Sequence, residues 1–326
     1  MAVVKIIYKK GDKNRMSNYR PICIICADYK LLAKIITSRM RPVLNYVIEK
    51  DQQGFIKDGD ITGNLILVKE IVQYCNEEGK EGALILMDFK KAYDRVDRGL
   101  MFKTLEKMNF EPEFVDLVKT LYGDAISAVE VNDELTREIL TGGGGVRQDT
   151  ISLFADDSCI CARQPFEDLK EARITMEKYE QASGSALHEG KTKIMKIGKT
   201  REKMMTNRQI GVKFTILEDK AQETYLGDII GNEVTEEQRF DGCLEKMQEK
   251  GDRWNRENVT GYGRALVSNT LVMPVILYRG RVNGMTAGLK KKVLKIVKEF
   301  VWPTLKWSIA LRGIAEGGIG VKDPSA

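Results

Sequence analysis

The sequence has few of the residues on which many enzymes depend. Of its 326 residues, one is a histidine, His188, and six are cysteines. A single histidine argues against metal centres built from several histidines, and against Ser-His-Asp or Cys-His catalysis in their ordinary forms. Any reaction must therefore depend on carboxylates and lysines, with or without a bound metal ion.

The cysteines are too few for a disulfide scaffold in a chain of this length. Cys23 and Cys26 form a lone Cys-x-x-Cys pair, and no second pair follows at the spacing of a zinc site. We therefore interpret these cysteines as small, buried hydrophobic residues rather than as metal ligands.

Long apolar runs are also missing. No segment approaches the roughly 18–20 consecutive apolar residues of a membrane span. The stretch from Met1 to Lys10 is too short in apolar residues for a signal peptide and has no small-residue cleavage site. We therefore expect an intracellular protein of the nucleus or cytoplasm, with no membrane partner.

What is present is an ordinary globular composition with an uneven charge. The chain is 43% hydrophobic and 30% charged, and its length predicts two or three domains of about 100–200 residues each. The net charge is +5, but the first 50 residues carry eleven basic side chains and only three acidic ones. This asymmetry fits either a surface that binds a polyanion or a solvated helix face.

Hydrophobic periodicity predicts a mixed α+β fold. We expect helices over residues 28–47, 62–77, 166–183 and 100–122, the last with a break near Pro112, and a largely helical region over 236–326. We expect strands over residues 2–8, 82–88, 151–154, 158–162 and 192–197, a strand that ends at 225–227, and a hairpin over 128–139.

Three carboxylates carry the strongest chemical signal. An apolar run ends on Asp88, and a tight strand–turn–strand segment holds Asp156 and Asp157 at its turn. If the two strands are neighbours, the acids meet at one sheet edge, where their repulsion requires a cation. Mg²⁺ prefers such oxygen ligands, and two ions can activate a hydroxyl and stabilise a leaving phosphate oxygen. Taken alone, Asp156-Asp157 would be interpreted as an exposed turn.

These acids lie in two segments, Asp88-Phe-Lys-Lys-Ala-Tyr-Asp94 and Phe154-Ala-Asp-Asp157. Other short sequence blocks lie before, between and after these two segments, along nearly the whole chain. They are residues 10–12, 18–21, 51–57, 145–148, 182–184, 191–193, 225–227, 263–265, 274, 300–302 and 317–320. Each block is weak by itself. In this order, the series resembles the reverse transcriptases of non-LTR (LINE-type) retrotransposons.

The resemblance implies a polymerase right hand. Fingers would span residues 1–80, a palm with an antiparallel sheet residues 81–235, and a thumb-like helical region residues 236–326. It also implies an RNA-directed DNA polymerase with Mg²⁺, or Mn²⁺, as cofactor. Its partners would be an RNA template, a DNA primer and dNTPs, and the reaction would be two-metal nucleotidyl transfer from dNTP to the primer 3′-hydroxyl.

The resemblance further implies the catalytic residues. Asp88, Asp156 and Asp157 would be the metal ligands, and Lys191 would protonate the leaving pyrophosphate. An ordinary solvated surface lysine is the alternative interpretation of Lys191.

Nucleotide binding is implied for four residues: Lys57, Phe89, Tyr93 and Gln148. Tyr93 matches an aromatic gate against the nucleotide 2′-hydroxyl, and Gln148 matches a contact to template and nucleotide. A core aromatic and a loop amide are the alternatives for these two. Leu226 and Gly227 resemble the turn that grips the primer. The lysines of residues 290–298 would follow a duplex backbone, or would form one solvated helix face.

Three departures from the family pattern bear on activity. The family continues after Gln148 with a long apolar helix, but here the catalytic hairpin follows directly. We therefore expect the palm helix to be missing and one palm surface to be uncovered, which would favour self-association. Gly59 stands where an arginine would bind the triphosphate, so nucleotide binding would weaken by roughly 1 kcal/mol or more. His188 replaces the usual asparagine.

Three interpretations remain open. The first is an active reverse transcriptase, which the three acids favour. The second is a catalytically inactive remnant that binds nucleic acid, which the missing helix and Gly59 favour. The third is a nucleotidyl cyclase of the palm type, which also uses carboxylates at strand ends. The 225–227 block and the thumb-like tail argue against it.

Overall fold

The computed structural model confirms a mixed α+β fold. It describes residues 2–9, 11–90, 95, 97–123, 126–131, 134–135, 139–140, 157–211, 213–255, 259–302 and 306–323. The strand expected over 151–154 and three predicted site residues, Tyr93, Gln148 and Asp156, lie outside this part of the chain.

The strands are β1 (Ala2–Tyr8), β2 (Tyr19–Ile24), β3 (Glu81–Met87), β4 (Ile126–Val131), β5 (Glu134–Leu135), β6 (Ile139–Leu140), β7 (Ser158–Ala162), β8 (Lys193–Gly198), β9 (Thr215–Ile216), β10 (Glu223–Tyr225) and β11 (Asp228–Ile230). The α-helices are α1 (Ala27–Val47), α2 (Ile61–Glu77), α3 (Arg98–Lys107), α4 (Pro112–Leu121), α5 (Pro165–Ser183), α6 (Asn207–Ile210), α7 (Glu236–Arg239), α8 (Cys243–Asn255), α9 (Gly261–Val267), α10 (Pro274–Asn283), α11 (Ala287–Val301) and α12 (Trp307–Ala310). Short 3₁₀ or π turns lie at Met16–Asn18, Lys199–Glu202, Ser268–Val272 and Ile314–Glu316.

These bounds agree with the predicted elements to within a few residues. The helix expected over 100–122 is broken before Pro112, which begins α4. The hairpin expected over 128–139 is present, because Val131 of β4 pairs with Glu134 of β5. Strand β2 was not predicted, since it contains Pro21 and most of its residues are exposed. Both features are typical of an edge strand, which is the place β2 has beside β1.

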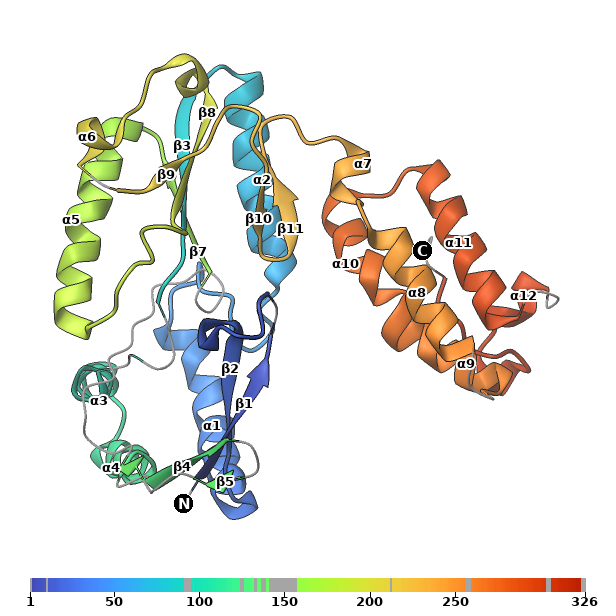
Figure 1. The fold of residues 1–326 in the computed structure, drawn as a ribbon, viewed down its shortest axis with the longest axis horizontal. Helices are drawn as coiled ribbons and strands as arrows, with labels where there is room; N and C mark the ends of the chain where they lie inside the picture. The colour runs from blue at the N-terminus through green and yellow to red at the C-terminus, as the bar shows by residue number, and fades with distance from the viewer. Residues whose placement is uncertain are drawn as a thin grey trace.

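A four-stranded sheet with the order β7-β3-β8-β9 forms the framework of the site (Figure 1). Strand β3 is antiparallel to both β7 and β8, and β9 is parallel to β8. Residues 82–87 of β3 are all buried. A central strand covered on both faces explains why β3 is a continuous apolar run without alternation.

Helices cover both faces of this sheet (Figure 1). On one face, Ile85 packs with Leu169 of α5 and with Phe214. On the other face, Leu84 packs with Leu65 of α2. Helices α5 and α2 therefore cover both faces of the described strands, on which the structure shows no uncovered palm surface. Self-association of the chain stays a prediction.

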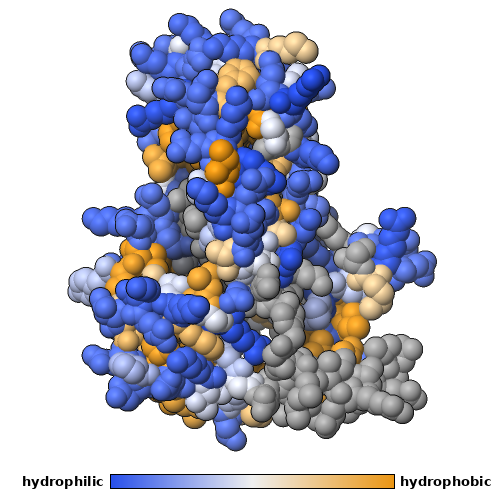
Figure 2. Space-filling model, turned by 90° about the vertical axis from the view of Figure 1, so that its left-hand side faces the viewer, coloured by the Kyte–Doolittle hydropathy of each residue, from blue (hydrophilic) through white to orange (hydrophobic). Residues whose placement is uncertain are grey.

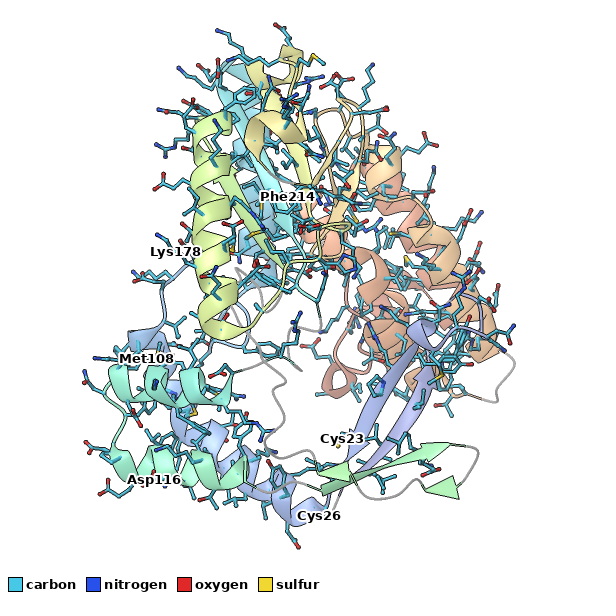
Figure 3. The ribbon with its side chains drawn as sticks, turned by 60° about the vertical axis from the view of Figure 1, so that its left-hand side comes forward. Cys23, Cys26, Met108, Asp116, Lys178 and Phe214 are labelled. Carbon is cyan, nitrogen blue, oxygen red and sulfur yellow. The ribbon has the colours of Figure 1, made fainter. Side chains whose placement is uncertain are left out.

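The outer side of α5 is solvated. Figure 3 labels Lys178 on α5, where its side chain is exposed, and Phe214, which is buried between α5 and the sheet. The upper part of the face in Figure 2 is mostly hydrophilic. This surface therefore gives no sign of a large apolar patch over α5.

A second lobe contains β1, β2, β4–β6, α1, α3 and α4 (Figure 1). Its small core joins Ile36 of α1 to Leu105 of α3 and Val115 of α4. The interpretation of Cys23 and Cys26 as buried is wrong, because both are exposed in this lobe (Figure 3). Cys23 lies in the edge strand β2 and Cys26 directly precedes α1, so neither has a layer packed over it.

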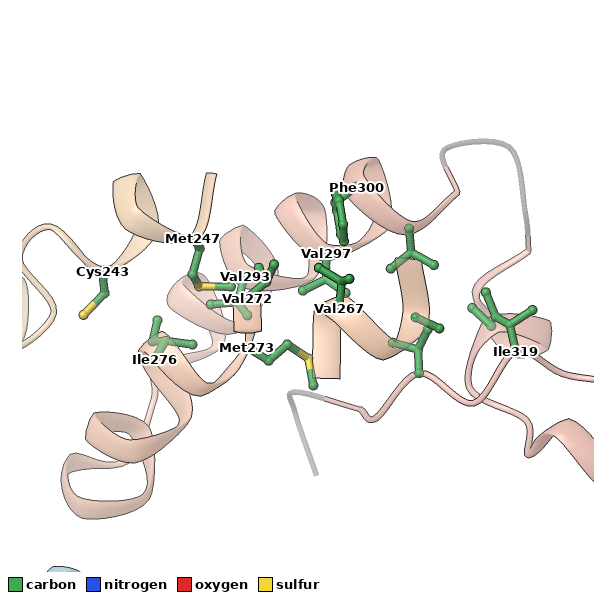
Figure 4. Packing of buried hydrophobic residues seen from close by; sticks show 14 of the residues in the cluster. Cys243, Met247, Val267, Val272, Met273, Ile276, Val293, Val297, Phe300 and Ile319 are labelled. Atoms are coloured by element: carbon green, nitrogen blue, oxygen red, sulfur yellow. The ribbon is translucent and has the colours of Figure 1, made fainter. Parts of the chain in front are cut away.

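The C-terminal region is helical, as predicted. Helices α8 to α11 pack around a core that includes Met247, Met273, Ile276 and Val297, all fully buried (Figure 4). The opposite side of α11 exposes several lysines, including Lys291, Lys295 and Lys298. Among the described residues, no helix is both long and apolar enough to cross a bilayer.

Candidate active site

Two of the predicted carboxylates meet where β3 ends and β7 begins. Met87 is paired with Ser158 in the antiparallel register of these strands. Asp88 directly follows Met87, Asp157 directly precedes Ser158, and both line one cleft. The sheet therefore brings together the two described members of the predicted acidic set.

Lys191 lies on the other side of Asp88. Its Nζ is 3.1 Å from Oδ2 and 3.4 Å from Oδ1 of Asp88. The loop that carries Lys191 is fastened to the same strand end, since the amide of His188 donates to the Asp88 carbonyl at 2.7 Å. The side chains of Lys191 and Asp88 remain 59% and 36% exposed. Substrate groups can therefore reach both.

These residues line a cleft of about 250 Å³. Its walls are formed by Leu86, Met87, Asp88, Asp157, Gly190, Lys191, Lys193, Glu223, Thr224 and Tyr225. Lys193 forms an ion pair with Glu223 across the cleft wall. The other charged residues that line the cleft are Asp88, Asp157 and Lys191.

Tyr225 contributes a buried polar atom to this cleft. The residue is 4% exposed, and its hydroxyl has no hydrogen-bond partner among the described residues. Burial, then the neighbouring Cys159 and Asp157, raise the pKa of Tyr225 well above its ordinary value. The phenol therefore stays neutral and keeps an unused donor beside the carboxylates.

The predicted primer-gripping residues form the turn that follows Tyr225. Tyr225 pairs with Asp228, so Leu226 and Gly227 form a two-residue hairpin turn between β10 and β11. Their φ angles are 48° and 81°, as a type I′ turn requires. Glycine accepts this conformation readily, whereas Leu226 needs outside support.

Two other predicted residues are not brought to the cleft. Phe89 is 5% exposed and packs in the core beneath α5, with its ring centroid 6.4 Å from that of Tyr179. Lys57 is exposed in the loop before α2 and is absent from the described residues that line the cleft.

The loop around Gly59 explains the glycine at that position. A Cβ on Gly59 would lie 2.1 Å from the carbonyl oxygen of Gln53, a contact that no side chain tolerates. The loop is closed by the Gly59 amide, which donates to the Ile56 carbonyl at 3.1 Å. An arginine in this place would require a different loop backbone.

A larger cavity of about 500 Å³ lies elsewhere, between α2 and the β11–α7 segment. It includes Lys69, Asn232 and Arg239 but none of the predicted catalytic acids. We place the candidate active site at the smaller cleft, because chemistry requires the converging carboxylates rather than the larger volume.

Sequence reasoning gave no role to three lining residues, Lys193, Glu223 and Tyr225. Lys193 begins β8, two residues after Lys191 of the preceding loop. That spacing was the available signal for Lys193. Glu223 could not be found in this way, because its pairing depends on how β10 packs against the sheet.

Comparison with known families gives a match over residues 7–230. The matching family is described as reverse transcriptase (RNA-dependent DNA polymerase). The matched region contains Asp88, Asp157, Lys191 and the turn after Tyr225.

Three curated proteins are similar to this chain. The Transposon TX1 uncharacterized 149 kDa protein of Xenopus laevis is 28% identical and matches 98% of this chain. The Retrovirus-related Pol polyprotein from type-1 retrotransposable element R2 of Popillia japonica is 24% identical over 49% of the chain. That from type-2 retrotransposable element R2DM of Drosophila melanogaster is 20% identical over 47% of it. The chain spans 27%, 23% and 14% of the lengths of these relatives, respectively.

Proposed function

Because this chain belongs to the reverse transcriptase (RNA-dependent DNA polymerase) family, we propose that it extends a DNA primer on an RNA template, using dNTPs. The similar transposon and retrotransposable-element proteins confirm the resemblance that the motif order predicted. The observation that carries the proposal is the cleft in which Asp88, Asp157 and Lys191 converge beside the turn after Tyr225. The family match gives no support to the nucleotidyl cyclase interpretation.

The three parts of the fold suit the three parts of a polymerase hand. We assign fingers to residues 1–80, palm to 81–235 and thumb to 236–326. Two packing arrangements cross these limits. Helix α2 covers the palm sheet, and α3 and α4 pack on α1. The exposed lysines on α11 support a thumb that follows the phosphates of a duplex.

The donors of the cleft fit a hard divalent cation. Asp88 and Asp157 offer carboxylate oxygens from adjacent strands, and such ligands suit Mg²⁺ or Mn²⁺. Asp156, next to them in sequence, would complete the ligand set. When bound, the metal would activate the primer 3′-hydroxyl and stabilise the leaving phosphate oxygen.

Lys191 supplies the proton in this proposal. Its ammonium lies 3.1 Å from Asp88 and is 59% exposed. It can therefore leave the carboxylate and reach a phosphate oxygen at the cleft mouth. Protonation of the leaving pyrophosphate by a positioned acid is worth about 10²–10⁴ in rate.

We further propose that the palm is shortened after Gln148. The alignment with the Xenopus relative covers 363 positions, and this chain has 326 residues. That relative therefore carries extra residues within the aligned region, in support of a missing segment. The covered faces of the β7-β3-β8 sheet support a palm that folds without it.

Primer extension on poly(rA)/oligo(dT) by the purified chain, in Mg²⁺ and then in Mn²⁺, tests the proposed function. The matched variant is Asp156→Asn, with its folding checked by circular dichroism. We expect extension by the wild-type chain and none by the variant. Folded wild-type protein that binds the duplex in a salt-sensitive way without extending it would instead be a nucleic-acid-binding remnant.

A further inference from the structure

Asp228 is a completely buried carboxylate directly after the Leu226–Gly227 turn, at 0% exposure. It pairs with Lys69 of α2 and lies 3.6 Å from Nε of Arg279 on α10. Asn283 of α10 donates to Oδ2 of Asp228 at 2.7 Å. We call these four residues the Asp228 cluster. It joins the palm-covering helix α2, the β10–β11 hairpin and helix α10 of the C-terminal helical region.

Hydrogen bonds join Asp228, Lys69 and Asn283, whereas Oδ1 of Asp228 has an ion pair with Arg279 but no hydrogen-bond partner among the described residues. Nζ of Lys69 donates to Oδ2 of Asp228 and, at 2.5 Å, to Oδ1 of Asn283. Arg279 and Asn283 are four residues apart and therefore lie on one face of α10. Burial lowers the pKa of Lys69, although the hydrogen bond that Lys69 donates to Asp228 opposes this shift. A buried carboxylate requires such partners, and removing one partner leaves a buried charge without compensation.

A second contact fixes the turn itself to the same helix. The hydroxyl of Tyr278 donates to the carbonyl of Leu226 at 2.5 Å. Leu226 is buried and adopts a positive φ that a leucine rarely accepts. Helix α10 thus holds the turn at two points, the Leu226 carbonyl and the Asp228 carboxylate.

The turn is also connected to the cleft. Tyr225 lines the cleft with Asp88 and Asp157, and it directly precedes Leu226 in the chain. A displacement of the turn therefore displaces a wall of the cleft.

We propose that Asp228 and Tyr278 are positioning residues, which hold the Leu226–Gly227 turn on α10 and so set where the primer 3′ end lies relative to Asp88 and Asp157. This inference rests on the proposed function. Neither residue touches the reacting atoms, and each acts through the turn.

The test compares Tyr278→Phe and Asp228→Asn with two matched controls. Tyr262→Phe and Asp241→Asn change exposed residues of the same region. A rescue variant, Asp228→Asn with Asn283→Asp, returns one carboxylate to the cluster beside Lys69. Full-length protein is used throughout, with melting temperature and circular dichroism recorded for each variant.

Three quantities are measured. Hydrogen exchange reports the mobility of residues 223–230 without any substrate. Fluorescence anisotropy gives the dissociation rate of a DNA primer on an RNA template. Single-turnover extension gives the rate of nucleotide addition and, separately, the dNTP dissociation constant.

We expect Tyr278→Phe and Asp228→Asn to speed exchange in the hairpin and to slow nucleotide addition about tenfold, since a primer end misplaced by about 1 Å is costly. The dNTP dissociation constant should stay within about twofold of the wild-type value, because the nucleotide contacts are untouched. The swap variant should recover part of the lost rate, and the controls should match the wild type.

Equal loss of nucleotide affinity and addition rate, or no change in hairpin exchange, would overturn the inference. If the wild-type chain extends no primer, the proposed function fails. Hairpin exchange and duplex dissociation still test the inference in that case. Faster hydrogen exchange in the hairpin and faster dissociation of the duplex in both variants would support the inference. Unchanged exchange and dissociation rates would contradict it.

Discussion

Nζ of Lys191 lies 3.1 Å from Oδ2 of Asp88, and this contact joins the loop after α5 to the end of the central strand β3. Both side chains are substantially exposed, at 59% and 36%. Exposed pairs of this kind contribute only about 0–1 kcal/mol to stability. The placement of Lys191 is therefore better explained by chemistry at the cleft than by the stability of the fold.

Replacing Lys191 should consequently affect the rate and spare the fold. We expect Lys191→Met to lower the single-turnover rate of nucleotide addition about 100-fold, as loss of a general acid does, while the melting temperature stays near that of the wild type. Lys191→Arg should lose activity too, because guanidinium is a poorer proton donor. Lys178→Met, on the exposed side of α5, is the control. Wild-type rates for Lys191→Met would remove this lysine from the mechanism.

Two glycines near α2 should respond in opposite ways to the same change. In Gly59→Ala the new Cβ would lie 2.1 Å from the Gln53 carbonyl oxygen, whereas nothing lies within 4 Å of the corresponding atom at Gly63. We expect Gly59→Ala to lower the free energy of unfolding by about 1–3 kcal/mol through strain. Gly63→Ala, within the helix, should raise it by up to about 1 kcal/mol.

Urea unfolding of both glycine variants measures this difference. Similar free energies for the two would mean that the loop over residues 53–60 relaxes to admit a side chain. In that case Gly59→Arg could also restore the family's arginine. Otherwise we expect Gly59→Arg to unfold the loop rather than to improve nucleotide binding.

The ion pairs of Arg201 predict a dependence of stability on pH. Arg201 donates to both carboxylate oxygens of Asp219, at 2.5 and 2.8 Å, and to Glu233 at 2.6 Å. These hydrogen bonds lower the pKa of Asp219 and of Glu233 below their ordinary values. Carboxyls with lowered pKa contribute stability above the ordinary value of about 4, and lose it as the pH falls through the folded-state value.

Arg201→Gln should therefore be less stable than the wild type at pH 6, and the gap should close as the pH is lowered through 4 and below. Unfolding by urea at a series of pH values measures the gap. Arg208→Gln, at an exposed position of α6, controls for the loss of one positive charge. A gap that is constant with pH would show that the pairs with Asp219 and Glu233 are not its origin.

Local pattern was enough to predict most elements and the ends of the key strands. The end of β3 before Asp88 and the start of β7 after Asp157 were predictable from local sequence. Each apolar run is bounded by an acidic residue, and a strand of such residues commonly ends where polar residues begin. The burial of the Phe89 side chain was not predictable. Phe89 lies just past the end of β3, where the direction of a side chain depends on the path of the chain that follows. The resemblance assigned it to the nucleotide, and the fold places it in the core.

Long-range packing accounts for what the sequence analysis missed. Helix α2 lies in the segment assigned to the fingers, and its side chain Leu65 packs on Leu84 of the sheet. Asp228 looks like an ordinary polar turn residue in the sequence. Its burial depends on Lys69 and Asn283, which lie 159 and 55 residues away along the chain. No local sequence pattern predicts that these three residues come into contact.

The most direct measurement is primer extension by Asp88→Asn, compared with the wild type and with Asp241→Asn on the same RNA template. Substituting a neighbour of a metal ligand typically costs about 10–100-fold, so loss of a ligand should cost at least about 100-fold. We predict that loss for Asp88→Asn with an unchanged circular dichroism spectrum, and full extension for Asp241→Asn. Extension by folded Asp88→Asn at the wild-type rate would contradict the assignment of this cleft as the polymerase site.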